Sequence, residues 1–514
     1  MFIIFIAKYH LSTYRSNQNG IWIPWYHITG KNNMKVISID LGATSGRVMI
    51  VNHENHRFTY EEVKRFDNRT YLDKEGYLRW DFSLLFGNIV SGIQDALKKE
   101  EDISSISIDS WAVDYGFVKE GKLYKDPLCY RDTHSFKGQK EFLAKVPFEK
   151  LYSLVGIQNL HFNTIYQLYS DTTDFQAMDC LLMIPDLIAY FLTGNARLEE
   201  TNASTTSFYC YKEKKLSDGL LEEIGIPKRL FSKLIEPGES YGNLKKEYWS
   251  KKEIPVLACA SHDTASAVLG ANGVGRFAYI SSGTWSLIGT ELKSPIMNDE
   301  SRNANFTNEI GYDDTVRFLK NTMGMFLINE TRNDYRKHGT EIKVGDIARL
   351  VNESKDTKTY LDVNDSCFET PGDMLEKIKA YVEKTSQILP STPGEMMKTI
   401  YKSMALSYRK IIENLERLTD RSIDSILVVG GGNQADVLNQ YTADACKVKV
   451  ITGASEATVL GNAMAQFISL KDIQSVEEGR ADIKNSIQGR TFQPKDEEYW
   501  DKEYDAYQKA INQR

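Results

Sequence analysis

A strand, a glycine turn and a second strand form a pattern that occurs twice in this sequence and restricts its fold more than any other feature. In the first copy, Lys35 to Asp40 alternates and is rich in Val and Ile, glycines bracket a turn, and Val48 to Val51 resumes as a strand. In the second copy, the turn Ser282 to Trp285 lies between two short apolar strands. Both segments are therefore predicted to be β-hairpins with glycine-containing tips.

The repetition of the hairpin at 35–51 and 277–292 suggests an internal duplication, and therefore two domains. We place the boundary near Asn272 to Gly275, where glycines interrupt the pattern, which gives domains at 34–272 and 273–514. Residues 1–33 show no clear period, and Met34 stands directly before the first convincing strand. We therefore interpret 1–33 as an N-terminal extension outside the fold.

The tip of the first hairpin has the composition of a phosphate-binding turn. From Asp40 to Arg47 it reads Asp-Leu-Gly-Ala-Thr-Ser-Gly-Arg. Glycines allow the backbone to approach an anion closely, and the hydroxyl groups of Thr44 and Ser45 add hydrogen-bond donors. Asp40, at the end of the strand, is suited to holding a magnesium ion through water. An ordinary hairpin turn is the alternative interpretation of this segment by itself.

A third glycine turn follows a buried strand later in the chain. Ile426 to Val429 is apolar, Gly430 to Gly432 follows, and Ala435 to Ala445 has the pattern of a helix. Three glycines remove the side chains that would block a flat base or its ribose, so this turn suits an adenosine. A tight packing turn is the alternative. The sequence matches neither the Walker phosphate loop nor the spacing of a dinucleotide fingerprint.

A candidate catalytic acid or base lies where another buried strand leads into a helix. Ile254 to Cys259 has the composition of the strand, and Asp263 lies at the start of the helix. The first amides of a helix can hold a carboxylate ionised and oriented, which suits a general base that deprotonates an alcohol. The alternative is that Asp263 only caps the helix. His262 is either structural or a ligand for a sugar hydroxyl.

Two further segments have the composition of a polyol pocket. Ile106 to Tyr115 is predicted to be a strand that ends in acids alternating with an aromatic residue, and Arg131-Asp132 follows Pro127 in a predicted loop. Carboxylates accept hydrogen bonds from sugar hydroxyl groups, and an aromatic face covers C–H surface. Solvated surface acids are the alternative for both segments.

Composition and charge exclude several classes of protein. The net charge of −7 and the pI near 5.8 give no basic field for nucleic acid. The six cysteines lie far apart, which is typical of reduced thiols in a cytoplasmic protein. The apolar stretch Leu181 to Leu192 is too short to span a membrane. His53 and His56 lie in a polar stretch that lacks other ligands, so we interpret them as part of a solvated turn rather than a metal site.

In their order along the chain, these motifs resemble those of the FGGY carbohydrate kinases. The resemblance runs from about Met34 to about Ile468, and it is closest to members that act on L-rhamnulose. The segments that carry it, beyond the three glycine turns, are Asp109 to Asp114, Phe162 to Leu168, Glu200 to Thr206 and Ala258 to Val268.

The resemblance implies a fold and an activity. The implied fold is two actin-like or ribonuclease-H-like α/β domains with an interdomain active-site cleft. The implied reaction is phosphorylation of L-rhamnulose at its 1-hydroxyl by Mg-ATP in bacterial rhamnose breakdown. Closure of the cleft would exclude water, which competes with the sugar for the phosphoryl group. We expect a monomer or small homo-oligomer with a ketose and ATP as its substrates.

Individual site residues also follow from the resemblance. The positions that it implies for ATP are Ala43, Thr44, Ser45, Gly46, Arg47, Thr284, Asn329 and Gly431. The positions that it implies for the sugar are Ala112, His262, Asp263, Thr264 and Asn321, with Asp263 as the proton acceptor. Two of these residues depart from the family pattern, because Ala112 stands where Gly is usual and Asn329 stands where a Gln would reach ATP.

Two other functions are consistent with the sequence. The first is an FGGY kinase for another substrate, such as L-fuculose, D-xylulose or glycerol, which only the sugar-pocket segments would distinguish. The second is a non-catalytic ATP switch of the actin and Hsp70 type. Such a switch would share the two phosphate hairpins but has no need of His262, Asp263 and Thr264 at a strand end.

Overall fold

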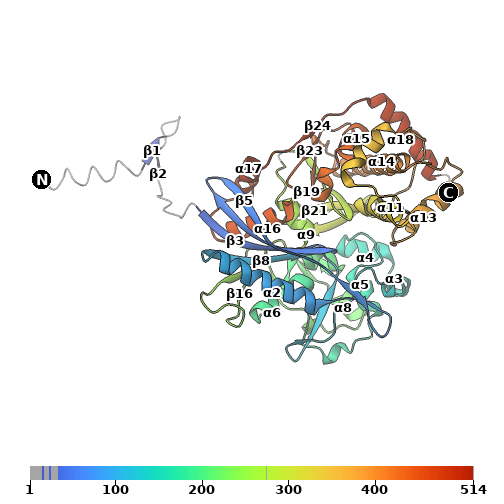
Figure 1. Ribbon diagram of the computed structural model, residues 1–514. Coiled ribbons are helices and arrows are strands. Elements are labelled where there is room, and N and C mark those ends of the chain that lie inside the picture. Colours follow the sequence, from blue (N-terminus) through green and yellow to red (C-terminus); the bar gives the residue numbers. More distant parts are fainter. Residues whose placement is uncertain (1–13, 17–21, 25–32, 274, 513–514) are drawn as a thin grey trace.

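The computed structural model describes residues 14–16, 22–24, 33–273 and 275–512. Most of the predicted extension at 1–33 therefore lies outside the described residues. Within it, β1 (Tyr14–Ser16) and β2 (Trp22–Pro24) pair antiparallel, and Asn33 already belongs to β3. Figure 1 shows the rest of the chain as two α/β domains, which confirms the predicted fold class.

The first domain is built on a six-stranded mixed sheet. β3 pairs antiparallel with β4 and parallel with β8, and β8 pairs parallel with β17. Because β3, β8 and β17 run in the same direction, their carboxyl ends meet at one edge of the sheet, where α/β proteins bind ligands. The strands in sheet order are β16 (Ser240–Asn243), β17 (Pro255–Leu257), β8 (Ile103–Ser110), β3 (Asn33–Leu41), β4 (Ser45–Glu54) and β5 (Arg57–Asp67).

The second domain repeats this arrangement with seven strands. β18 pairs antiparallel with β19 and parallel with β22, so its glycine turn and the triple-glycine turn lie at the same edge. The strands in sheet order are β20 (Thr307–Ile310), β21 (Val316–Met323), β19 (Trp285–Leu292), β18 (Phe277–Ser282), β22 (Ser425–Val429), β23 (Val450–Thr452) and β24 (Thr491–Phe492). Both predicted glycine hairpins are confirmed by this pairing.

Helices cover the outer faces of the sheets. α2 (Phe82–Lys99) and α6 (Ile184–Thr193) pack on the first sheet, while α11 (Met325–Lys337), α14 (Pro393–Thr419) and α15 (Asp436–Cys446) pack on the second. The start of α14 is encoded locally. The Thr392 side chain accepts a hydrogen bond from the Glu395 amide, and a proline occupies the first turn. The other outer helices of this domain are α10 (Asp299–Asn303), α12 (Ile347–Glu353), α13 (Met374–Lys384), α17 (Val476–Ser486) and α18 (Glu497–Asn512).

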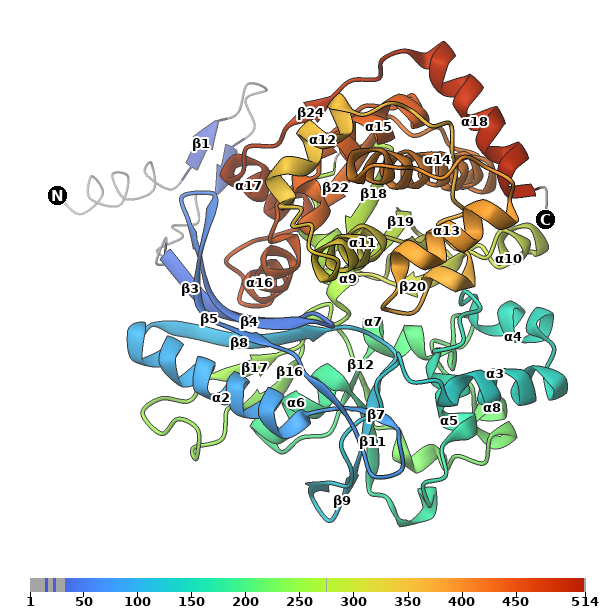
Figure 2. The same cartoon turned by 45° about the vertical axis from the view of Figure 1, so that its right-hand side comes forward.

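Two helices lie between the sheets and join the domains, as Figure 2 shows. They are α9 (Asp263–Leu269) and α16 (Ala457–Ser469). Glycines allow their close approach, because a Cβ built on Gly461 would lie 1.8 Å from the carbonyl oxygen of Ser266. The apolar cluster around α16 contains Val36 and Val51 of the first sheet as well as Tyr279 and Leu427 of the second. The two domains therefore share this apolar cluster between their sheets.

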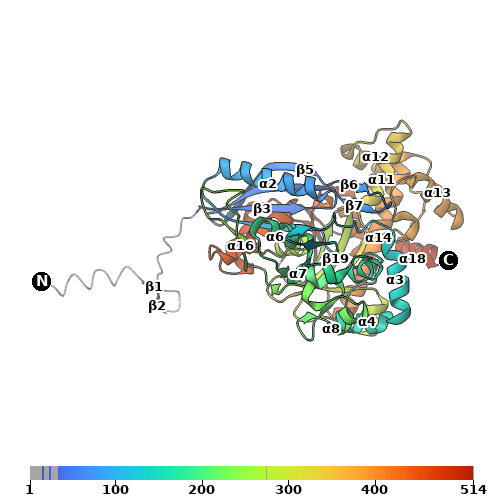
Figure 3. The same ribbon diagram turned by 90° about the horizontal axis from the view of Figure 1, so that it is seen from below.

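The first domain also carries a helical subdomain with its own apolar core, seen at one side of the molecule in Figure 3. Its helices are α3 (His134–Lys145), α4 (Phe148–Val155), α5 (Thr164–Ser170), α7 (Glu200–Ala203) and α8 (Asp218–Glu223). Short strands connect this region: β6 (Thr70–Leu72), β7 (Leu78–Trp80), β9 (Tyr115–Lys119), β10 (Lys122–Leu123), β11 (Cys180–Met183), β12 (Leu198–Glu199), β13 (Tyr209–Cys210), β14 (Lys215–Leu216) and β15 (Leu234–Ile235).

One predicted strand is shorter than expected. The strand predicted from Ile106 to Tyr115 ends at Ser110, and Val113 has a φ of 67°. A branched residue is rarely found in this left-handed conformation, and such strain is concentrated at functional sites. Among the described residues, no helix is both long and apolar enough to cross a membrane.

Candidate active site

A cavity of about 360 Å³ lies where the edges of the two sheets face each other. The turn between β3 and β4, the turn between β18 and β19, the triple-glycine turn and the start of α9 all contribute to its wall. Most of the predicted site residues line it, namely Asp40, Ala43, Thr44, Ser45, Arg47, Ala112, His262, Asp263, Thr264, Thr284, Asn321 and Gly431. The cavity therefore brings together residues that are distant in the sequence.

Gly46 and Asn329 are not part of this wall within the described chain. A Cβ on Gly46 would lie 2.4 Å from the ring of Phe66, so this glycine is required for packing inside the first sheet. Asn329 lies on the exposed side of α11 and accepts a hydrogen bond of 3.3 Å from Arg332. Its contact with ATP stays a prediction.

The first hairpin turn is fixed by backbone hydrogen bonds. The amide of Gly42 donates to the carbonyl of Ser45 at 2.9 Å, and the amide of Asn68 donates to the carbonyl of Thr44 at 3.0 Å. These bonds hold the turn in a defined shape, with Ala43, Thr44 and Ser45 facing the cavity. A preformed turn of this kind suits an anion such as a phosphate.

The second and third glycine turns pack on each other. A Cβ on Gly432 would lie 1.9 Å from Oγ of Ser282, and one on Gly430 would lie 2.9 Å from the carbonyl of Ser282. By contrast, a Cβ on Gly431 would meet no described atom within 4 Å. Gly430 and Gly432 therefore allow the close approach of the two turns, while Gly431 borders the open space beside Thr284.

Asp263 is the first residue of α9 and faces the cavity, with 30% of its side chain exposed. The N-cap position belongs to His262, so the alternative of Asp263 as a simple helix cap is wrong. Burial raises the pKa of Asp263 above the ordinary value, and the negative charge of Asp40 adds to this. Oγ1 of Thr264 donates a hydrogen bond of 3.1 Å to this carboxylate.

His262 is held by a buried ion pair from the second domain. Its Nδ1 lies 3.0 Å from Nη2 of Arg317 and 3.3 Å from Oε2 of Glu309. Arg317 is fully buried and pairs with Glu309 at 3.0 Å. Burial alone would raise the pKa of Glu309, but the positive charge of Arg317 lowers it below its usual value. Glu309 is therefore ionised, and the pair fixes the imidazole from behind.

The turn that carries His262 is also held from its own domain. The buried carboxylate of Glu199 accepts hydrogen bonds from the amide and hydroxyl of Ser261, at 3.1 Å and 2.5 Å. It also accepts from the amide of Thr201 at 2.9 Å. Glu199 therefore links the turn before α9 to the segment that begins α7.

A group of carboxylates surrounds the phosphate turn. Oδ2 of Asp40 accepts two hydrogen bonds from Arg47, whose other nitrogen lies 2.7 Å from Oε2 of Glu456. Asp109 is buried behind Asp40, and burial together with the charge of Asp40 raises its pKa well above the usual value. Oδ1 of Asp109 has no hydrogen-bond partner within the described chain. Because the carboxylates of Asp40 and Glu456 share the guanidinium of Arg47, a further cation nearby is favoured.

Aromatic residues line part of the cavity wall, but Asp114, an acid close to them in the sequence, does not. Trp111 and Tyr130 face the cavity, whereas Asp114 is fully buried and is not part of the wall as described. Its Oδ2 accepts hydrogen bonds from the indoles of Trp80 and Trp111, at 2.7 Å and 2.9 Å. The sequence had suggested that Asp114 binds the sugar. In the structure Asp114 instead positions the aromatic wall.

Gln158 and Asn321 also line the cavity, and they connect the two domains. The amide and the side-chain nitrogen of Asn321 donate to Oε1 of Gln158 at 2.9 Å and 3.1 Å. Side-chain amides of this kind are suited to binding hydroxyl groups. Gln158 was not predicted, and neither were Arg317, Glu309 and Glu456. The available sequence signal was the pair of opposite charges, Glu309 in β20 and Arg317 in β21.

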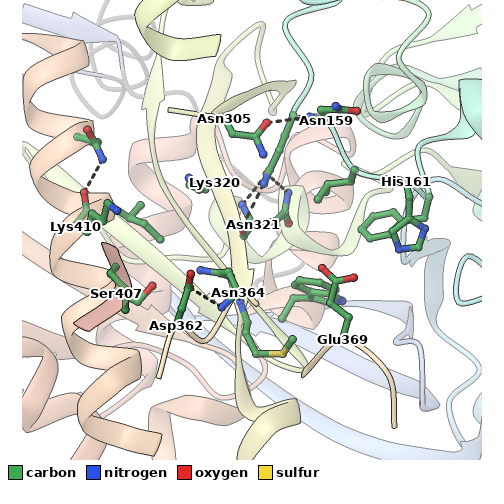
Figure 4. Close-up of a pocket in the computed structure, with 18 residues that line it drawn as sticks. Asn159, His161, Asn305, Lys320, Asn321, Asp362, Asn364, Glu369, Ser407 and Lys410 are labelled. Carbon is green, nitrogen blue, oxygen red and sulfur yellow. Dashed lines mark hydrogen bonds between the residues drawn. The ribbon is translucent and has the colours of Figure 1, made fainter. Parts of the chain in front are cut away.

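A second cavity of about 380 Å³, drawn in Figure 4, shares Gln158, Leu160, Phe162, Trp285 and Asn321 with the first. Nζ of Lys320 lies in its wall and donates to the carbonyl of Ala304 at 2.7 Å. Burial lowers the pKa of Lys320 to about 8, and the charge of Lys410 adds to this. The second cavity therefore continues from the end of the first that Gln158 and Asn321 line.

Comparison with known proteins gives the same family for both domains. Residues 35–270 match the family model described as FGGY family of carbohydrate kinases, N-terminal domain, and residues 278–470 match that of the C-terminal domain. A rhamnulokinase of Ligilactobacillus salivarius is 38% identical over 93% of this chain and 98% of its own length. A rhamnulokinase of Bacteroides thetaiotaomicron is 35% identical over 92% of this chain and 99% of its own.

Solved structures of other sugar kinases share the fold. A ligand-bound xylulose kinase from Lactobacillus acidophilus superposes with a TM-score of 0.74 at 17% identity, covering 93% of this chain and 96% of its own. Plasmodium falciparum glycerol kinase with ADP gives a TM-score of 0.76 at 14% identity, covering 93% of this chain and 97% of its own. At these identities, the likeness shows the two-domain fold alone.

Proposed function

The chain belongs to the FGGY family of carbohydrate kinases, and we propose that it transfers the γ-phosphoryl group of ATP to the 1-hydroxyl of L-rhamnulose. The choice of sugar is supported by relatives named rhamnulokinase that are 38% identical over nearly the whole of both chains. The observation that carries the proposal is the position of Asp263. Its carboxylate faces a cavity whose wall includes glycine turns from both domains.

The two substrates are proposed to bind at different parts of the cleft. The β- and γ-phosphates would contact the turn at Ala43 to Arg47 and the hydroxyl of Thr284, and the adenosine would lie over Gly431. The ketose would lie between Asp263, the imidazole of His262 and the amide of Asn321. Its apolar C–H surface would contact the aromatic wall. The proposal is supported by the presence of these groups, except Gly46, in one cavity.

Asp263 is proposed to act as the general base. As the 1-oxygen attacks the γ-phosphorus, the hydroxyl proton passes to the carboxylate and the bond from phosphorus to the ADP oxygen breaks. Burial raises the pKa of Asp263, which makes it a stronger base than an ordinary aspartate. Arg47 is placed to offset the negative charge of the phosphates.

A divalent cation, which we propose to be Mg²⁺, would enter with ATP and neutralise charge on its phosphates. The residues present fit such a cation. Asp40 and Asp263 line the cavity, and Asp109 behind them has a buried oxygen without a partner among the described residues. Asp40 would hold the cation through water, because Mg²⁺ keeps most of its hydration shell.

A non-catalytic ATP switch is less well supported by the site. It would not require the buried pair of Arg317 and Glu309 that holds His262 beside Asp263. We further propose a cytoplasmic location, which is supported by cysteines buried as thiols at positions 129, 180, 210 and 259.

A coupled assay of ADP release tests the function. With Mg-ATP, kcat/KM for L-rhamnulose should exceed the values for L-fuculose, D-xylulose and glycerol, and the product should carry phosphate on its 1-oxygen. A higher kcat/KM for one of the other substrates would replace L-rhamnulose while keeping the kinase activity. ATP hydrolysis that no polyol stimulates would contradict the kinase itself.

A further inference from the structure

The far end of the β4–β5 hairpin carries two histidines that the proposed kinase reaction does not use. Asn55 and His56 form its turn, with φ values of 52° and 57°, as in the tight turns that join twisted strands. β4 has 10 residues, so this turn lies about 30 Å from the phosphate turn at the other end of the strand. The site at the histidines is therefore separate from the active site.

The expectation of a solvated turn without further ligands is wrong, because the second domain supplies carboxylates to it. His53 is buried, with Nδ1 at 2.6 Å from Oδ2 of Asp472 and Nε2 at 3.0 Å from Oδ2 of Asp482. The amide of Phe58 donates to Oγ of Ser486 at 2.7 Å. These contacts fix α17 against the hairpin before any ligand is considered.

Three potential ligand atoms converge at the outer side of this contact. Nδ1 of His56 lies 3.3 Å from Oδ2 of Asp482 and 4.0 Å from Oε1 of Glu478, and the three side chains offer ligand atoms within 4.8 Å of one another. Glu478 and Asp482 are four residues apart in α17 and so share one face of the helix. In a tetrahedral zinc site, neighbouring ligand atoms are about 3.3 Å apart. The separation between His56 and Asp482 already has this value, and a small rotation of the exposed His56 side chain would bring its nitrogen closer to Glu478.

We propose that His56, Glu478 and Asp482 form a binding site for a divalent transition-metal ion of the Zn²⁺ type that links the two domains. One imidazole and two carboxylates match the ligand preferences of Zn²⁺, while Mg²⁺ prefers oxygen alone. The His56 side chain is 71% exposed, so a fourth position is open to water.

The surrounding charges support a cation at this place. In the ion pairs described, Asp472, Glu478 and Asp482 pair only with the imidazoles of His53 and His56, and Oε2 of Glu478 also accepts a hydrogen bond from the amide of Gln474. A divalent ion would offset this excess of carboxylates. His53 would act as a positioning residue, because its hydrogen bond to Asp482 orients the carboxylate that the ion requires.

Calorimetric titration of the full-length, chelator-treated protein with Zn²⁺, in excess Mg²⁺, tests this proposal. One Zn²⁺ ion should bind per chain at this site, and His56→Gln should weaken that binding by at least about tenfold, because even outer-shell substitutions have effects of this size. Glu478→Gln should act in the same direction. Zn²⁺ should also raise the Tm of the wild type but not that of His56→Gln.

His338→Gln is the matched control, because His338 is an exposed histidine that bonds only a backbone carbonyl among the contacts described. It should bind Zn²⁺ as the wild type does. Because His56 is exposed and lies outside the proposed catalytic machinery, His56→Gln should fold and keep its kinase activity. Equal Zn²⁺ affinity in wild type and His56→Gln would overturn the proposal, and so would Zn²⁺ binding by neither protein. Either outcome would mean that His56 and Asp482 contact each other without binding a metal ion.

Discussion

Arg317 of the second domain donates a hydrogen bond of 3.0 Å to Nδ1 of His262, the residue directly before the proposed base in the first domain. A guanidinium can only donate, so Nδ1 accepts and a neutral imidazole carries its proton on Nε2. Nε2 lies 3.4 Å from Oδ1 of Asp263. The orientation of the His262 imidazole therefore depends on a contact between the domains.

Substitution of Arg317 should separate its structural from its functional role. Arg317→Met leaves the charge of Glu309 buried without its partner, which should lower the free energy of unfolding by about 3–5 kcal/mol. The double variant Glu309→Gln/Arg317→Met should recover most of this loss in urea denaturation, because neither buried charge remains. Its KM for the ketose should stay raised, since His262 has lost its donor. Equal stability of the single and double variants would mean that the two charges are not coupled.

Asp263→Asn should remove the proposed base without changing the shape of the site. We expect kcat to fall on the order of 10²-fold or more, with ATP affinity in calorimetry unchanged. Asp218→Asn, at a surface acid of α8 that pairs with Lys215, is the control and should retain full activity. A normal turnover rate for Asp263→Asn would eliminate the catalytic assignment.

The pH dependence of kcat/KM should show the environment of Asp263. A general base acts when deprotonated, so activity should fall as the pH drops through the pKa of Asp263. Burial raises that pKa, which places the acidic limb above the ordinary range of an aspartate near 3.9. The residual activity of Asp263→Asn should lack this limb. A wild-type profile that stays flat down to the ordinary range would show that another group limits the reaction.

The elements that local patterns determine were predicted from the sequence. The two hairpins and the triple-glycine turn follow from apolar alternation interrupted by glycine, because only glycine permits these close approaches. Asp263 could be placed at a strand-to-helix junction because an apolar strand pattern changes to a helix pattern at that residue. The sequence pattern did not predict the left-handed conformation of Val113, because this conformation depends on tertiary contacts. Thr164 and Gln167, for example, donate hydrogen bonds to its carbonyl.

The features that the sequence did not predict depend on contacts between distant parts of the chain. His53 looked isolated because its partner Asp472 is 419 residues away in the sequence. In the same way, no local pattern connects His262 with Arg317, which are 55 residues apart and on different domains. Such pairings exist only after both sheets have formed and docked around α9 and α16.

The three glycines of the third turn should respond differently to alanine. At Gly431 the added methyl group meets no described atom within 4 Å, so Gly431→Ala should fold normally and raise the KM for ATP by projecting toward the proposed adenosine. At Gly432 the methyl group would lie 1.9 Å from Oγ of Ser282, so Gly432→Ala should lower the Tm. Thermal melts and ATP titrations of the two variants distinguish these effects. A lowered Tm in Gly431→Ala with unchanged ATP affinity would place the nucleotide elsewhere.

Asp114 should make the stability of the protein depend on pH between about 4 and 6. Burial raises its pKa to about 6, although donors such as Trp80 and Gln167 act in the opposite direction. Because the pKa in the folded state is higher than in the unfolded chain, the stabilising contribution is fully present below about pH 4 and is lost as the pH rises through 6. A shift of this size corresponds to about 3 kcal/mol.

Asp114→Asn should remove this dependence and still fold. The amide oxygen of Asn can accept the hydrogen bonds that Oδ2 now receives from Trp80, Trp111 and Tyr130. Its NH₂ group would take the place of Oδ1, so only the hydrogen bond that Gln167 now donates to that oxygen is lost. The difference in unfolding free energy between wild type and variant should therefore change by about 3 kcal/mol from pH 4 to pH 7, in favour of the variant at the higher pH. Urea denaturation at a series of pH values measures this difference, and a constant difference would show that Asp114 has the same pKa in the folded and unfolded protein.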